Sequence, residues 1–317
     1  MHPLLRKLLN FELPIPAFVV GCFPAIFTIG ASPKGKLPQK LMRTLRCLAC
    51  PFLGLFYTCN IKNDETALYW LPKSCFIGVD GSNIPYKPFG HHAMEMKYSD
   101  ANRAVLEKLE DCMTNASVME RFSSLASAYY IILGLIVGIS RVLVPSICED
   151  WPYIPLALAW TLPAIYRRTV NARLLVDDPK VAIGDGKITM QKFVYDEDRE
   201  HMHSCVVLTV LASIAVPWLS VILAYFTPPK GFFCRSKYLT VFCTIWTFNC
   251  IVAYIHHWVG ENNKLVNRII RIWFSACGVG IAMLLIVLGL LSIEREWWIR
   301  LFGETCGNTC HEKKFTF

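Results

Sequence analysis

Three long stretches of this chain contain no Asp, Glu, Lys or Arg and are rich in apolar residues. They cover residues 204–229, 238–260 and 272–293, which are 26, 23 and 22 residues long. A helix of about 20 apolar residues crosses the hydrocarbon core of a bilayer, which is about 30 Å thick. The core of a soluble domain seldom contains three such stretches. The sequence therefore predicts an integral membrane protein.

The overall composition agrees with this prediction. The 317 residues are 54% hydrophobic and 18% charged, whereas a soluble domain has about 25% charged residues. The net charge is +8, but the Lys and Arg residues cluster beside the apolar stretches, where cytosolic orientation and anionic lipid explain them. We therefore expect the lipid bilayer and cytosolic proteins as partners, and no nucleic acid.

The fold class that we predict is an all-α polytopic membrane protein with about six transmembrane helices and one short interfacial or re-entrant segment. The apolar stretch 13–33, near the N-terminus, is predicted to be a retained span, because the larger of its two flanking basic clusters follows it. A signal peptide is the alternative. The apolar segment 47–61 has 15 residues, which is short for a span. The six predicted crossings cover residues 13–33, 122–143, 151–166, 204–227, 238–259 and 272–293.

The basic clusters predict the orientation, because Lys and Arg near span ends favour the cytosolic side. We place the cluster Arg167, Arg168 and Arg173 on the cytosolic side. Three segments then lie in the cytosol, namely 34–121, 167–203 and 261–271. They contain 12, 7 and 3 of the 32 Lys and Arg residues. Both termini are then outside or lumenal, in the plasma membrane or an endomembrane.

This orientation divides the chain into alternating membrane and loop regions. Asn115 begins the sequon Asn-Ala-Ser, which we expect to be cytosolic and unglycosylated. The predicted regions are 1–61 with the first transmembrane helix and the interfacial segment, 62–121 as a cytosolic loop, 122–166 as a transmembrane helix pair, 167–203 as a second cytosolic loop, 204–293 as a three-helix transmembrane region, and 294–317 as an outside or lumenal tail.

Four of the 14 cysteines fall on the predicted outside. An even number of cysteines in an oxidising compartment is typical of disulfides, and four cysteines allow three connectivities. Free thiols and palmitoylation are the alternatives. The disulfide candidates are Cys148, Cys234, Cys306 and Cys310.

Two histidine pairs lie at one predicted membrane face. His201 and His203 precede one span, and His256 and His257 end the next. Imidazole is a common ligand of zinc and copper, so the four are metal-site candidates. The alternative is interfacial polar residues beside Trp258. We expect no bound metal and no cofactor.

The latter half of the chain contains the segments "PPKGFFCRSKYL", "LPAIYRR" and "LLVDDP", and a tail with Cys306 and Cys310. With these segments the chain resembles uncharacterised multi-pass fungal integral membrane proteins. The resemblance implies an integral membrane protein and supplies no activity or site residue.

No motif in the sequence indicates catalysis. Nucleophile elbows, Walker loops and zinc-protease helices are absent, and the predicted spans contain no acid or lysine that would mark an ion pathway. Polar residues such as Asn249 and Thr247 suffice for hydrogen bonds between helices. We expect a non-enzymatic scaffold, sorting or sensing protein; the alternatives are a channel or facilitator for a small solute, and a membrane enzyme with a cytosolic His/acid site.

Overall fold

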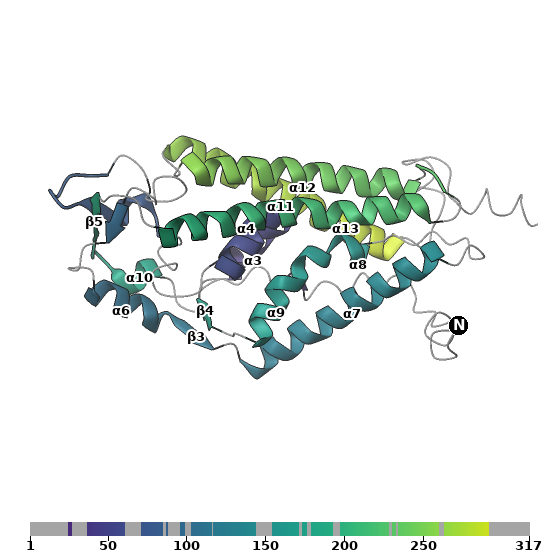
Figure 1. Cartoon of the computed structure of the whole chain (residues 1–317), viewed down its shortest axis with the longest axis horizontal. Coiled ribbons are helices and arrows are strands. Elements are labelled where there is room, and N and C mark those ends of the chain that lie inside the picture. Colours follow the sequence, from purple (N-terminus) through teal and green to yellow (C-terminus); the bar gives the residue numbers. More distant parts are fainter. Residues whose placement is uncertain are drawn as a thin grey trace, which may run out of the picture.

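The computed structural model is mostly helical, with the long helices side by side (Figure 1). It describes residues 25–26, 37–60, 71–84, 87, 96–98, 103–115, 117–143, 154–170, 173–175, 179–192, 197–227, 230–232, 234–259 and 263–291. The predicted crossing at 13–33 lies almost entirely outside these residues.

Four helices are long and apolar enough to cross a membrane, and they match four of the predicted crossings. Their apolar stretches are Arg121–Ile139, His203–Phe226, Ser236–Trp258 and Lys264–Leu285. The prediction of a helical membrane protein is therefore confirmed. The helices are α7 (Val118–Leu143), α11 (Glu197–Phe226), α12 (Cys234–Val259) and α13 (Lys264–Leu291).

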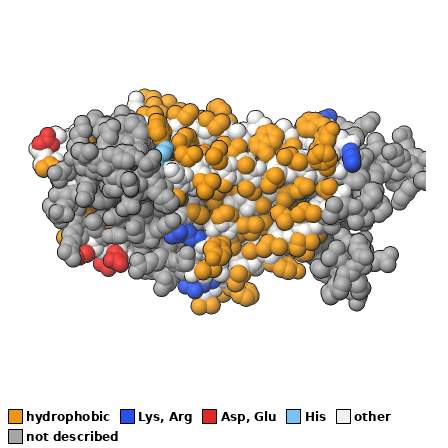
Figure 2. All heavy atoms as spheres, in the orientation of Figure 1, with side chains coloured by type: hydrophobic (Ala, Val, Ile, Leu, Met, Phe, Trp, Pro, Cys, Tyr) orange, Lys and Arg blue, Asp and Glu red, His pale blue; other side chains and the backbone are white. Residues whose placement is uncertain are grey.

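The outer surface of this bundle is apolar. Only 28% to 44% of the residues in each apolar stretch are buried inside the protein, and side chains such as Ile136, Leu219 and Ile251 are exposed. Figure 2 shows hydrophobic side chains covering the bundle between Lys and Arg side chains at its two borders. In water such a surface would be unstable, so a bilayer is the environment that it fits.

The predicted crossing at 151–166 is not a single helix where the structure describes it. It consists of α8 (Ile154–Ala157), a 3-10 turn η6 (Ala159–Thr161) and α9 (Leu162–Val170). Pro155 and Pro163 each lie in the first turn of a helix, where proline is tolerated. The segment packs along α7, and a Cβ on Gly134 would come within 2.4 Å of Pro155.

The segment 47–61, predicted to be interfacial or re-entrant, is described up to residue 60. Residues 37–60 form α3 (Leu37–Ala49), α4 (Pro51–Leu55) and a π-helical turn η1 (Phe56–Asn60). Leu48, Cys50 and Phe52 are fully buried, so these side chains pack inside the bundle. The position depends on Gly278 of α13, where a Cβ would come within 2.1 Å of the Leu45 carbonyl oxygen.

Two small sheets lie in the loops of this mostly helical chain. In the first, β5 (Ile188–Lys192) lies between β1 (Phe76–Gly78) and β2 (Met96–Tyr98), parallel to β1 and antiparallel to β2. In the second, β3 (Met113–Asn115) pairs antiparallel with β4 (Arg173–Leu175). Both sheets join the loop 62–121 to the loop 167–203. Strands of three to five residues are too short to give a clear alternating pattern.

Two short helices complete this end of the molecule. They are α6 (Arg103–Asp111) and α10 (Pro179–Ile183), and they pack against each other. A 3-10 turn η3 (Lys73–Cys75) precedes β1. We call the two sheets together with α6 and α10 the loop platform, which lies at the left of Figure 1.

Candidate functional site

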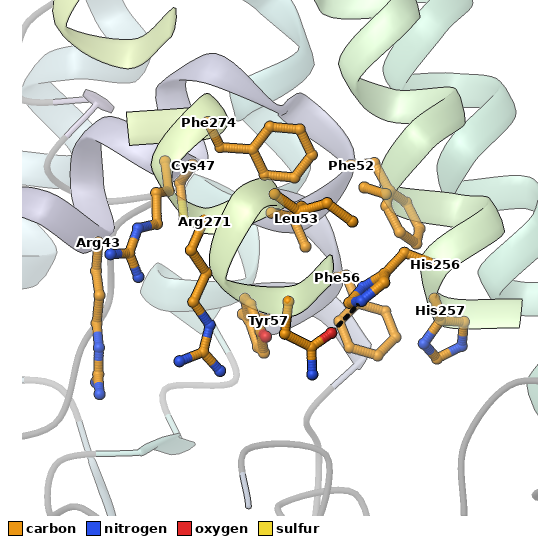
Figure 3. A pocket seen from close by; sticks show the side chains of 14 residues that line it. Arg43, Cys47, Phe52, Leu53, Phe56, Tyr57, His256, His257, Arg271 and Phe274 are labelled. Carbon is orange, nitrogen blue, oxygen red and sulfur yellow. Dashed lines mark hydrogen bonds between the residues drawn. The ribbon is translucent and has the colours of Figure 1, made fainter. Parts of the chain in front are cut away.

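A cavity of about 210 Å³ lies between α3, the α4–η1 segment and the neighbouring ends of α12 and α13. One wall is aromatic and includes Phe52, Phe56 and Phe274. The side chains in Figure 3 converge on this cavity from both sides of the break between α3 and α4. It is the candidate site because it combines an apolar wall with several polar groups.

Three arginines give the cavity its charge. Arg43 and Arg46 are three positions apart on α3 and therefore share one face, and Arg271 comes from α13. Figure 3 shows the Arg43 and Arg271 side chains extending in the same direction. Among the residues described around the cavity, none is Asp or Glu. The site therefore favours an anion.

The Arg46 side chain is held in place by α13. Its Nε donates a hydrogen bond to Ser275 Oγ at 2.9 Å, and the Ser275 hydroxyl donates in turn to the Arg271 carbonyl oxygen at 2.7 Å. Burial lowers the pKa of the Arg46 guanidinium, and the charges of Arg271 and Arg43 lower it further. An anion between these groups would relieve their repulsion.

A break in a helix forms the inner wall of the cavity. Pro51 has no N–H to continue α3, so carbonyl groups at the end of α3 need other donors. Trp246 Nε1 donates to the Leu48 oxygen and Asn249 Nδ2 to the Ala49 oxygen, both at 2.8 Å. Side chains of α12 therefore take the place of the missing backbone donors.

Asn249 also joins α12 to α13. Its Oδ1 accepts a hydrogen bond from Trp273 Nε1 at 2.8 Å, and a second contact between helices runs from Trp218 Nε1 to Thr247 Oγ1 at 3.0 Å. The predicted use of Asn249 and Thr247 in hydrogen bonds between helices is thus confirmed. Asn249 is fully buried, and its two hydrogen bonds connect α12 to α3 and to α13 beside the cavity.

The histidine candidates gather at this end of the bundle with different partners. His256 hydrogen-bonds to Asn267 beside the cavity, the His257 ring lies 4.9 Å from that of Phe56, and the His203 ring lies 4.6 Å from that of Trp258. The His201 side chain is outside the described part. Among the side chains that the structure does describe, no group of three His, Cys, Asp or Glu could hold a metal ion.

The disulfide candidates lie mostly outside the described ranges. The structure does not describe Cys148, Cys306 or Cys310. Cys234 is the first residue of α12, and its side chain is not described. Among the nine cysteines whose side chains are described, none forms a disulfide with another. The disulfides therefore stay a prediction.

Sequence reasoning used Arg43, Arg46 and Arg271 only as orientation signals and missed the cavity. The three-residue spacing on α3 was the one available signal for a shared basic face. Nothing in the sequence indicates that Arg271 lies near the α3 face that holds Arg43 and Arg46. No known protein family, curated protein or solved structure matches this chain, so its function is argued from its own residues.

Proposed function

We propose that this membrane protein acts without catalysis, as a scaffold, sorting factor or sensor, through its loop platform on the cytosolic side. The observation that supports this is the parallel pairing of β1 with β5, in which Phe76 lies opposite Ile188. It joins two loops that are far apart in the chain into one folded surface. A folded surface suits binding of a cytosolic protein better than two separate loops do.

The connections between the platform and the spans support a sensing role. The strand β3 ends at Asn115 and α7 begins at Val118, while β5 ends at Lys192 and α11 begins at Glu197. These short connections would transmit a shift of either helix to the sheets. Ligand binding within the bundle could thereby change the surface that a partner meets.

Strand pairing also supports the proposed six crossings. Asn115 before α7 lies opposite Arg173 after α9, so the chain leaves and returns at one end of the bundle. The α8–α9 segment would then serve as the third crossing, and 13–33 as the first. The proposed cytosolic side of the platform rests on the basic clusters.

The second candidate is a channel or facilitator, because two interrupted helices meet inside the bundle. The η1 turn after α4 contacts α9. In membrane transporters, interrupted helices often place free backbone groups at the substrate site. Here the Leu48 and Ala49 carbonyl groups are occupied by Trp246 and Asn249. Because these carbonyl groups already have hydrogen-bond donors, the break between α3 and α4 suits a structural role better than a solute-binding role. We therefore rank the channel below the loop platform.

An experiment on the central strand of the larger sheet tests the platform. Ile188 is fully buried in β5, and Ile188→Pro removes a backbone donor from a central strand. Cytosolic proteins that co-purify with the full chain should be lost with Ile188→Pro. They should be retained with Lys230→Gln, an exposed change outside the platform. Membrane insertion and helix content should stay at wild-type levels in both variants.

Two outcomes would contradict the platform. One is an unchanged set of bound proteins in Ile188→Pro. The other is solute flux into liposomes that contain the purified wild-type protein, measured with ions and small sugars, because flux would favour the channel or facilitator.

A further inference from the structure

We propose that the cavity between α3, α4, α12 and α13 binds the phosphate monoester headgroup of an anionic phospholipid. This inference is independent of the loop platform. It rests on the charge of the cavity, its position along the spans and the apolar side chains beside it.

The charge fits a phosphate monoester. Arg43, Arg46 and Arg271 line one small cavity, and guanidinium groups bind phosphate oxygens through paired hydrogen bonds. A phosphate monoester carries a charge of about −1.5 to −2 at neutral pH, whereas the phosphodiester of an ordinary phospholipid carries only one negative charge. Three arginines that line one cavity therefore favour the monoester.

The position fits a lipid headgroup. His256 lies near the end of the apolar stretch Ser236–Trp258, and Arg271 directly precedes the charge-free stretch 272–293. The cavity is therefore at the border of the apolar surface, where the phosphate groups of a bilayer lie. Basic pockets between transmembrane helices at this depth are suited to phosphorylated headgroups.

The surroundings of the arginines fit acyl chains. The cavity that contains Arg43, Arg46 and Arg271 is also lined by apolar side chains, which include Leu53, Ile270 and Phe274. These side chains continue the apolar wall away from the arginines. A soluble phosphate compound would leave them uncovered, whereas the chains of a lipid would cover them. The lipid is thus the source of phosphate that the structure favours.

The test measures binding of dioctanoyl phosphatidic acid to the purified full-length protein in detergent. Dioctanoyl phosphatidylcholine and glycerol 3-phosphate serve as the other two probes. We expect phosphatidic acid to bind at least about tenfold more tightly than either of them. Arg271→Gln should weaken its binding about tenfold, because a hydrogen bond to a charged group contributes about that much.

A matched control is available one turn away. Arg268 is exposed on α13 and does not line the cavity, so Arg268→Gln removes the same charge and should leave binding unchanged. If Arg271→Gln fails to fold, Arg43→Gln replaces it with the same expected loss.

Four results would overturn the proposal. Equal binding of glycerol 3-phosphate and phosphatidic acid would indicate a soluble ligand. Equal losses in Arg268→Gln and Arg271→Gln would indicate diffuse surface charge. Wild-type affinity in the cavity variant, or no preference for phosphatidic acid over phosphatidylcholine, would exclude the site.

Discussion

Replacing Asn249 with leucine should destabilise the bundle, because one side chain joins three helices. The substitution keeps the approximate volume but removes the hydrogen bonds to the Ala49 oxygen and from Trp273 Nε1. A hydrogen bond between membrane helices contributes about 0.6 kcal/mol on average and up to about 1.7 kcal/mol. The polar atoms left unpaired add a further cost. We therefore expect Asn249→Leu to lower the free energy of unfolding by about 2 kcal/mol.

Reversible unfolding in mixed micelles of sodium dodecyl sulfate and a mild detergent, followed by helical circular dichroism, measures this change. Thr244→Val is the matched control on the same helix. The Thr244 hydroxyl donates only to the Thr240 carbonyl oxygen of its own helix, so its loss should change the free energy by less than about 0.5 kcal/mol. An equally small change in Asn249→Leu would refute the role of α12 in holding the break between α3 and α4.

Three further predictions concern other parts of the chain. Gly278→Ala should cost more than about 2 kcal/mol in the same assay, because its Cβ would lie 2.1 Å from the Leu45 oxygen and force α3 away. Thr161→Val should be neutral or stabilise by about 1 kcal/mol, because the Thr161 hydroxyl is buried without a hydrogen-bond partner among the described residues; a clear loss of stability would contradict this. Asn115 should carry no glycan when the protein is expressed in a eukaryotic cell, and a mass shift on glycosidase treatment that depends on Asn115 would refute the cytosolic placement.

The long helices could be predicted from the sequence because their signal is local. A stretch such as 272–293 has no charge over the length of a bilayer crossing, and no distant residue is needed to recognise it. The prolines gave a weaker signal. Pro51, Pro155 and Pro163 lie in the first turns of short helices, whereas Pro217 lies inside α11. Only distant partners determine which proline interrupts a helix and whether the interrupted segment packs inside the bundle.

The sheets and the cavity depend on contacts between distant segments. Ile188 pairs with Phe76, but nothing in the sequence around either residue identifies the other as its neighbour. Likewise, the shared face of Arg43 and Arg46 follows from their spacing, but the approach of Arg271 depends on the close packing of α3 at Gly278. Counting charges therefore predicts an orientation, which stays a prediction, and it cannot predict a binding site.

Cysteine crosslinking across the larger sheet tests most directly whether the two loops form one platform. Ile77 lies opposite Thr189, at the spacing of about 4.8 Å between neighbouring strands that a disulfide can bridge. With Ile77→Cys and Thr189→Cys, and a protease site inserted between residues 144 and 153, we expect mild oxidation of membranes to keep the two fragments joined on a non-reducing gel. Separate fragments, or equal joining when Gln191→Cys replaces Thr189→Cys, would contradict it.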